Sequence, residues 1–275
     1  MTSTTIARRE DDRFFRMPNP FVEPSPRRVR VKFGGAIIAD SKHPLLLSQY
    51  GPGQLPGYLP SYYFPPEDVR MDALTSSAPS DLDGSVAYQT IRIADHVADR
   101  AAWIVQRPPA ELTLLHTYIS FTWERMDAWY EEEEEVFVHA RDLHKRVDVL
   151  ASARHVQVMI AGEMIAETRR PYLLFETHLP TRYYIPRENV RTDLLTPTTH
   201  TSRCPYKGIA QYWSVTLGGR TLDNIVWSYP EPIPENPKIK DLLCFFNERV
   251  DLCIDGEVQQ RPLTPWSTDA PEGRL

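Results

Sequence analysis

The sequence has no long apolar run, and this limits where the protein can work. No stretch of about 18 consecutive apolar residues occurs in the 275 residues, so a membrane-spanning helix is not expected. A secretory signal peptide would need an apolar segment near its start, where this chain instead has the charged run Arg8-Arg9-Glu10-Asp11-Asp12-Arg13. We therefore expect a protein without a membrane partner and predict a cytoplasmic location.

Cysteine is also scarce. The chain has three cysteines, Cys204, Cys244 and Cys253, an odd number at wide spacing. Such usage suits a reducing compartment and provides no disulfide framework. No Cys-x-x-Cys pair occurs, so neither a structural zinc site nor any other metal site is predicted.

The chain also has fewer basic than acidic residues. The 31 lysines and arginines face 37 acidic residues, which gives a formal charge of −6. Nucleic-acid binding normally needs a basic face, so we expect no nucleic-acid partner. With 25 prolines and 12 glycines, the chain should form many short elements, and its length is enough for two domains.

The chain is a tandem duplication. Segments of the first half recur in the same order in the second half over roughly a hundred residues, as expected for a repeat architecture. The matches are 31–41 with 158–168, 62–65 with 183–186, 69–75 with 190–196, and 121–127 with 245–251. We therefore expect the two copies to fold alike.

Each copy begins with a β-hairpin pattern. Val29, Val31 and Phe33 alternate with basic residues before Gly34-Gly35, and the second copy repeats this around Ala161-Gly162. Helix is limited to one short proline-started segment per copy, at 108–111 and 237–243. The predicted class is mainly β, with antiparallel hairpins and one short helix in each domain.

Composition divides the chain into five parts. We expect an N-terminal extension at 1–26, a first repeat at 27–130, an acidic and polar linker at 131–150, a second repeat at 151–258 and a tail at 259–275. The five glutamates at 131–135 are typical of a solvated connection. An insertion at 51–58 of the first copy is rich in glycine and proline and would form a loop over the neighbouring repeat.

Reactive side chains are concentrated in the second copy. Glu176 replaces Gln49 of the first copy, Arg182 replaces Ser61, and the run from Cys204 to Gly208 has no equivalent thiol or amine. We therefore place the candidate site in the second repeat and treat the first as degenerate.

Three residues are candidates for catalysis. Glu176 follows the apolar Leu-Leu-Phe run, so burial would raise its pKa and suit it to acid–base work, the alternative being a salt bridge to Arg182 or Arg187. Lys207 would bind an anionic group or remain a surface lysine. Cys204 would be a nucleophile or a thiol packed beneath the turn.

Four further residues are candidates for substrate binding. Arg182 would bind negative charge, and Tyr184 would offer its hydroxyl to a ligand. His200 and Tyr212 would line the same site, although a solvated histidine and a core tyrosine are the alternative interpretations.

The motifs resemble the family known as domain of unknown function 427. The resemblance rests on Gly-x-x-(Ile/Val)-Ala-(Asp/Glu)-(Ser/Thr), Tyr-Tyr-x-Pro, Thr-x-x-Cys-Pro-Tyr-Lys-Gly-x-Ala-x-Tyr-Trp, Trp-Ser-Tyr-Pro-x-Pro and Phe-x-x-Glu-Arg-Val-Asp. It covers nearly the whole chain as two copies. It implies two tandem β-tent-like (Mss4-like) domains and carries the label nucleotidyltransferase-like.

Three functions are compatible with these residues and with the resemblance. The first is an enzyme without a metal or cofactor that acts by acid–base chemistry on an anionic or aromatic metabolite, as a monomer or homodimer. The second is a ligand-binding or regulatory protein, with haem ligated by Cys204 and His200 as one form of it. The third is nucleotide transfer, implied by the family label alone.

Overall fold

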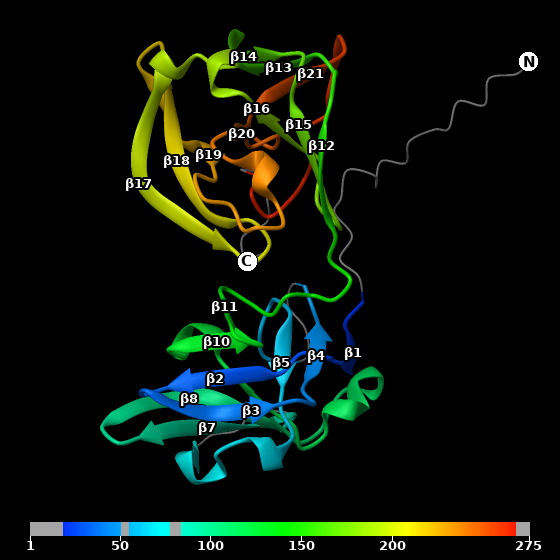
Figure 1. The fold of residues 1–275 in the computed structure, drawn as a ribbon, viewed down its shortest axis with the longest axis vertical. Helices are drawn as coiled ribbons and strands as arrows, with labels where there is room; N and C mark the ends of the chain where they lie inside the picture. The colour runs from blue at the N-terminus through cyan, green and yellow to red at the C-terminus, as the bar shows by residue number, and fades with distance from the viewer. Residues whose placement is uncertain (1–18, 51–54, 78–83, 268–275) are drawn as a thin grey trace, which may run out of the picture. The chain divides into compact units, whose positions relative to one another are not determined.

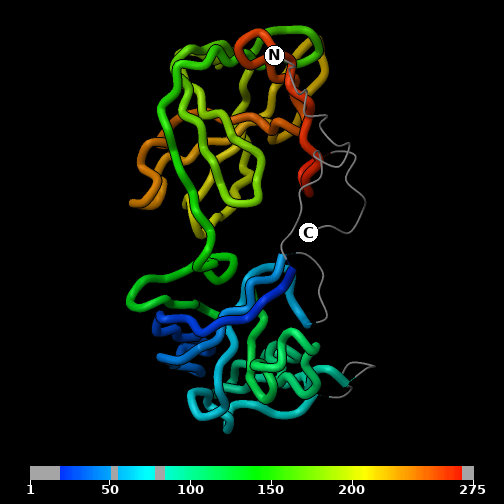
Figure 2. Tube along the Cα trace, turned by 90° about the vertical axis from the view of Figure 1, so that its right-hand side faces the viewer, coloured from blue at the N-terminus to red at the C-terminus, as the bar shows by residue number. Residues whose placement is uncertain are grey.

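The computed structural model describes residues 19–50, 55–77 and 84–267, and it forms two mainly β units (Figure 1). One compact unit ends at His144 and the other begins at Lys145. Within the described residues the chain passes from the first unit to the second at this point, so each unit corresponds to one copy of the repeat (Figure 2).

The first repeat contains three antiparallel sheets. Two of them meet where Phe64 and Ile119 exchange backbone hydrogen bonds of 2.8 and 2.9 Å, giving the combined order β1-β4-β5-β9-β8-β7-β6. The third sheet has the order β11-β10-β2-β3. The strands are β1 (Phe21–Pro24), β2 (Val29–Phe33), β3 (Ala36–Ser41), β4 (Leu45–Ser48), β5 (Ser61–Tyr63), β6 (Leu74–Ser76), β7 (Val86–Ile93), β8 (His96–Val105), β9 (Ile119–Phe121), β10 (Ala128–Glu131) and β11 (Glu134–Val136).

The second repeat contains a seven-stranded and a four-stranded antiparallel sheet. Their orders are β12-β15-β16-β20-β19-β18-β17 and β14-β13-β21-β22. The strands are β12 (Val147–Ala151), β13 (Val156–Ile160), β14 (Glu163–Thr168), β15 (Tyr172–Glu176), β16 (Arg182–Ile185), β17 (Leu195–Cys204), β18 (Gly208–Leu217), β19 (Arg220–Ser228), β20 (Leu243–Phe245), β21 (Asp251–Ile254) and β22 (Glu257–Val258).

The two copies share one strand order, which confirms the expectation that they fold alike. Their irregularities also correspond, because the β7–β8 register shifts after Gln89 and the β18–β19 register shifts after Trp213. A buried indole donates to a buried tyrosine hydroxyl in both, from Trp103 to Tyr63 at 3.4 Å and from Trp227 to Tyr184 at 3.2 Å. The mainly β prediction is likewise confirmed.

Helical structure in the described residues consists of short 3₁₀ segments. The two expected helices appear as η4 (Ala110–Leu115) and η8 (Pro237–Ile239), and five further segments of three residues each accompany them. These are η2 (Pro66–Asp68), η3 (Met71–Ala73), η5 (Trp123–Arg125), η6 (Arg187–Asn189) and η7 (Thr192–Leu194). None of the helices found there is long and apolar enough to cross a membrane.

The segment expected to be a polar linker differs from that expectation. Its start completes β10 and forms β11, and its end forms β12 of the second repeat. Glu131 is buried, accepting a 2.8 Å hydrogen bond from the Tyr62 hydroxyl and lying 3.1 Å from the guanidinium of Arg27. These partners compensate its charge. The other four glutamates of the run, 132–135, are exposed, as expected for a solvated segment.

The expected N-terminal extension and C-terminal tail each contain residues that form part of the adjacent repeat. Strand β1 lies within the expected N-terminal extension and pairs with β4. In the tail, Arg261 forms a 2.7 Å ion pair with Asp251. Of the insertion in the first copy, residues 51–54 lie outside the described residues, while Leu55 packs into the hydrophobic core of its own repeat.

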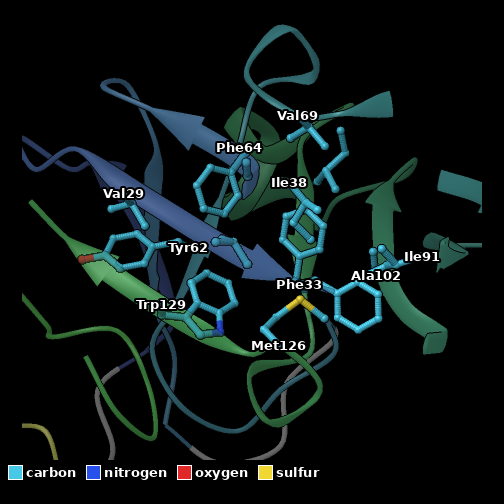
Figure 3. Close-up of a cluster of buried hydrophobic side chains, with 14 of the residues drawn as sticks. Val29, Phe33, Ile38, Tyr62, Phe64, Val69, Ile91, Ala102, Met126 and Trp129 are labelled. Carbon is cyan, nitrogen blue, oxygen red and sulfur yellow. The ribbon is translucent and has the colours of Figure 1, made fainter. Parts of the chain in front are cut away.

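Apolar side chains fill the space between the sheets of each repeat. Figure 3 shows this core in the first repeat, with Tyr62, Phe64 and Trp129 packed beside Val29. In the second repeat, one face of the seven-stranded sheet packs on the four-stranded sheet through Val158, Ile165 and Val226 among others. The opposite face, which we call the inner face, carries a separate cluster around Leu174, Tyr184 and Trp227.

Candidate functional site

The inner face of the seven-stranded sheet brings together side chains from distant segments. The alternation of β15 places Leu174 and Glu176 on it, and the pairing of Tyr212 with Trp227 adds an aromatic residue from each of β18 and β19. In Figure 1 the sheet curves around the segment that contains η8. The apolar members of the cluster include Val149, Ala210, Ile239 and Cys244.

A buried Lys–Glu–Lys triad lies at one end of this face. The Lys207 ammonium donates to Oε2 of Glu176, and the Lys145 Nζ lies 3.4 Å from Oε1. Side-chain exposure is 5% for Lys145, 5% for Glu176 and 12% for Lys207. Two ammonium groups therefore flank one carboxylate away from bulk water, and the triad carries a net positive charge.

The β17–β18 hairpin positions Lys207. Its backbone N–H donates to the Cys204 carbonyl at 3.3 Å, and its own carbonyl accepts from Ile233 at 3.2 Å. The Asn236 side chain donates to the Tyr206 carbonyl at 2.7 Å. These contacts fix the turn against the loop that follows β19, so the lysine reaches Glu176 from a constrained backbone.

The opposite charges in the triad favour the ionised forms of Glu176 and Lys207. Burial by itself would raise the pKa of Glu176, but Lys207 and Lys145 outweigh it and the pKa is lowered. Burial would likewise lower the pKa of Lys207, but Cys204 and Glu176 raise it on balance. The expected raised pKa of Glu176 is therefore wrong, because the sequence did not reveal its two lysine partners.

Arg182 does not join the triad. It forms two 2.7 Å hydrogen bonds with the carboxylate of Glu248, which also accepts one of 2.7 Å from Thr264. Its guanidinium lies over the rings of Trp227 and Trp266, at 5.5 and 5.6 Å from their centroids. Glu176 and Arg182 are thus not partners, and the guanidinium is held in a buried pair of its own.

The other residues predicted to bind substrate lie at different depths. Tyr184 is fully buried and its hydroxyl accepts from the Trp227 indole. The Tyr212 hydroxyl shares a 2.7 Å hydrogen bond with Ser202. His200 is exposed, with its ring 4.6 Å from that of Tyr212.

Cys204 is partly buried at the end of β17 and lies close enough to influence Lys207, Tyr212 and Tyr229 electrostatically. His200 precedes it by four residues of the same strand, a separation of about 13 Å along an extended chain.

Two residues of the site were not predicted from the sequence. Lys145 had been assigned to the linker, and Tyr229 follows the buried Trp227 by two residues. Tyr229 is 5% exposed and packs in the same apolar cluster as Trp227. Burial raises its pKa, with further contributions from Tyr184 and Cys204. Residues two apart on a strand share a face, so the position of Tyr229 two residues after Trp227 could have predicted its place on the inner face. No sequence pattern indicated that Lys145 belongs to the site.

A cavity of about 160 Å³ lies elsewhere in the second repeat. Thr181, Tyr183, Asn247 and Gln259 are among its lining residues, and no predicted site residue lines it. Tyr183 alternates with Tyr184 on β16 and packs against the core between the two sheets. In the described part of the chain, no group of three or more His, Cys, Asp or Glu is placed to hold a metal ion.

The fold and the triad define a two-repeat β protein whose second repeat carries a buried cationic cluster. The chain belongs to the family described as Domain of unknown function (DUF427), whose sequence model matches residues 21–132 and 148–256. These two segments agree with the two structural repeats. Among curated proteins, none matches the sequence.

Proposed function

We propose that the second repeat is an enzyme that binds a small anionic metabolite beside the Lys145–Glu176–Lys207 triad and moves a proton on it with Glu176. The observation that supports this proposal is the buried excess of positive charge. Buried ammonium groups are costly unless an opposite charge compensates them, and Lys145 and Lys207 share the carboxylate of Glu176. A bound anion would add further negative charge beside them.

The surroundings of the triad favour an organic anion with an aromatic or apolar part. Lys207 carries three N–H donors, and the contact with Glu176 uses one of them. The adjoining inner face contains the partly buried ring of Tyr212 beside the buried ring of Trp227. A carboxylate would bind the ammonium groups while an attached ring packs on these aromatic side chains.

Glu176 is suited to the role of base because it is ionised. Its lowered pKa makes it a weak base while both lysines act on it alone. A bound anion adds negative charge beside the carboxylate and raises its pKa. Binding would therefore strengthen the base at the moment when substrate is present.

Anion binding can be tested with 3-phenylpropionate and the neutral 3-phenylpropanamide as calorimetric probes. We expect the carboxylate to bind and the amide to bind at least about 10-fold more weakly, because a charge-assisted contact is lost. Lys207→Met should weaken binding of the carboxylate by a similar factor. The exposed Lys240 provides the matched control, and Lys240→Met should bind as the wild type does.

Equal affinity for the carboxylate and the amide, or an unchanged affinity in a folded Lys207→Met variant, would contradict an anion site. Binding without turnover of any 3-phenylpropionate analogue would favour a ligand-binding or regulatory protein instead. We propose neither haem ligation nor nucleotide transfer as the function.

We further propose that the protein works in the cytoplasm as a monomer or homodimer. All three cysteines are free, and burial raises the pKa of the Cys244 thiol to about 12, which keeps it protonated and unreactive. Free thiols of this kind are compatible with a reducing compartment.

A further inference from the structure

Three segments of the second repeat enclose the cavity of about 160 Å³. The start of β16 contributes Thr181 and Tyr183, and the turn that follows β20 contributes Asn247. The segment that follows β22 contributes Gln259 and Gln260. Among the described residues, all those that line the cavity are uncharged, in contrast to the triad on the inner face.

Hydrogen bonds to the backbone hold two amide side chains in the wall of the cavity. Asn247 is 7% exposed, and its amide donates to the Thr181 carbonyl at 2.7 Å. The Gln259 amide donates to the Glu257 carbonyl at 2.9 Å, and its backbone N–H donates to the Leu252 carbonyl at 2.8 Å. Both side-chain contacts use N–H groups, and an amide also has a carbonyl oxygen that can accept hydrogen bonds. The wall therefore suits a ligand with N–H donors.

Tyr183 supplies the cavity with a ring and a hydroxyl donor. The ring packs against the core between the two sheets, and Pro180 and Pro262 add further apolar lining. Burial raises the pKa of Tyr183, while Arg154 opposes the increase and Asp255 adds to it. The hydroxyl is therefore protonated at neutral pH and can donate to a ligand oxygen.

The first repeat has larger or paired side chains at two of these positions. Tyr62, the counterpart of Tyr183, is fully buried, and its hydroxyl donates to Glu131 at 2.8 Å. Trp123, the counterpart of Asn247, stacks on a second indole with 4.2 Å between the ring centroids. In the second repeat a partly buried tyrosine and a smaller amide line open space at the same two positions. The comparison of the copies therefore identifies these two positions as the ones that differ around the cavity.

We propose that this cavity binds an uncharged ring compound that carries a carboxamide group. A cavity of about 150 Å³ can hold a benzene molecule, so the observed volume admits one six-membered ring. The ring packs against Tyr183 and the two prolines. The carboxamide N–H groups donate to the side-chain oxygens of Asn247 and Gln259, and the ligand carbonyl accepts from the Tyr183 hydroxyl.

The lining residues discriminate against other occupants. Because the described lining residues carry no charge, an ionised carboxylate would lose its hydration without gaining an opposite charge. A hydrocarbon ring would cover the oxygens of Asn247 and Gln259 without offering them a donor. Ordered water is the competing occupant, because a polar cavity of this size can hold it.

Titration with benzamide, followed by NMR of the backbone N–H groups, tests this proposal. Benzoate has the same ring with a charge, and toluene lacks the carboxamide. We expect saturable shifts of the signals of 181–183 and 259–261 with benzamide. Benzoate and toluene should bind at least about 10-fold more weakly, because each loses hydrogen bonds to the wall.

Tyr183→Phe and Gln259→Leu should each weaken benzamide binding by about 5- to 10-fold. The first keeps its ring in the core, and the second loses only an exposed contact with Glu257, so both variants should fold. Gln211→Leu changes an exposed glutamine of β18 and is the matched control, with wild-type affinity expected. Binding of 3-phenylpropionate should be unchanged in Gln259→Leu, which separates this cavity from the proposed anion site.

Benzamide shifts that avoid 181–183 and 259–261 would overturn the proposal. The absence of saturable binding would do the same and would leave ordered water as the occupant. Equal affinity for benzamide and benzoate, or for benzamide and toluene, would contradict recognition of an uncharged carboxamide. Wild-type affinity in folded Tyr183→Phe would contradict the assigned contact, and this variant decides the matter should Gln259→Leu not fold. Because 3-phenylpropionate reports on the anion site alone, failure of either proposal is seen separately.

Discussion

Glu176 is ionised because two lysines from different segments converge on it. Lys145 reaches it because β12 pairs with β15, where Val147 lies opposite Glu176, and Lys207 reaches it from the β17–β18 turn. The sequence identified Glu176 and Lys207 as important from their absence in the first copy. It did not identify their pairing, since contacts between residues about thirty positions apart depend on strand register rather than local pattern.

Replacing Glu176 tests the triad through its pH dependence. Because the folded-state pKa is lowered, the carboxylate stabilises the fold above its ordinary pKa of about 4.3, and this stabilisation is lost as pH falls through the folded value. Glu176→Gln removes the carboxylate that the buried Lys145 and Lys207 share and should cost about 3–5 kcal/mol at pH 7. Urea unfolding at falling pH should show this difference from wild type shrinking below about pH 4.

The exposed carboxylate of Glu188 provides the control. It lies 2.9 Å from Arg170, and both side chains are mostly exposed, so Glu188→Gln should change the unfolding free energy by less than about 1 kcal/mol at any pH. A Glu176→Gln deficit that stayed constant with pH would show that the carboxylate is not paired as described.

Among the elements, the β17–β18 hairpin depends most on one residue. Gly208 begins β18 with φ +104°, a conformation that side chains other than glycine's rarely adopt. An added Cβ there would lie 3.0 Å from the carbonyl oxygen of Glu231. The glycine therefore permits both the turn and its close approach to the loop that holds Lys207.

Gly208→Ala should destabilise the second repeat and displace Lys207. Gly219 is the matched comparison, because it also has positive φ (+77°) but has no atom within 4 Å of an added Cβ. Gly219→Ala should cost about 1–2 kcal/mol for its conformation alone, and Gly208→Ala more. Thermal unfolding measures the difference, and 3-phenylpropionate affinity should fall only for Gly208→Ala. Equal destabilisation by the two substitutions would mean that the loop containing Glu231 moves away from the added Cβ without measurable cost.

Element type was easier to predict than element contacts. Alternation around Gly34-Gly35 and Ala161-Gly162 predicted hairpins that the structure contains, because period-two patterning is local. Charge runs were less reliable. The glutamates at 131–135 indicated solvent, and 132–135 are exposed. Glu131 is the exception, because it is buried against Tyr62 and Arg27, partners that lie more than sixty residues away.

At the scale of the whole molecule, duplication has produced two copies of one framework with different inner faces. Gln49 occupies the position of Glu176, since Leu45 pairs with Tyr63 just as Tyr172 pairs with Tyr184. Its side-chain N–H donates to the Gly57 carbonyl at 2.7 Å, and the nearby Leu55 fills the apolar cluster. Leu55 and Gly57 of the insertion therefore contact their own repeat, where the second repeat carries a charged triad.

From this difference we predict that replacing Gln49 affects only the stability of the first repeat, whereas replacing Glu176 also affects anion binding. Gln49→Leu leaves the Gly57 carbonyl without its donor and should cost the first repeat about 1–3 kcal/mol. Hydrogen exchange resolved by peptide should show lost protection in β4 and β5, with 3-phenylpropionate affinity unchanged. Glu176→Gln should instead lower protection in β12 and β15 and alter affinity for the anion. If Gln49→Leu changed that affinity as much as Glu176→Gln while the fold was retained, the site would include the first repeat and its assignment to the second repeat alone would be wrong.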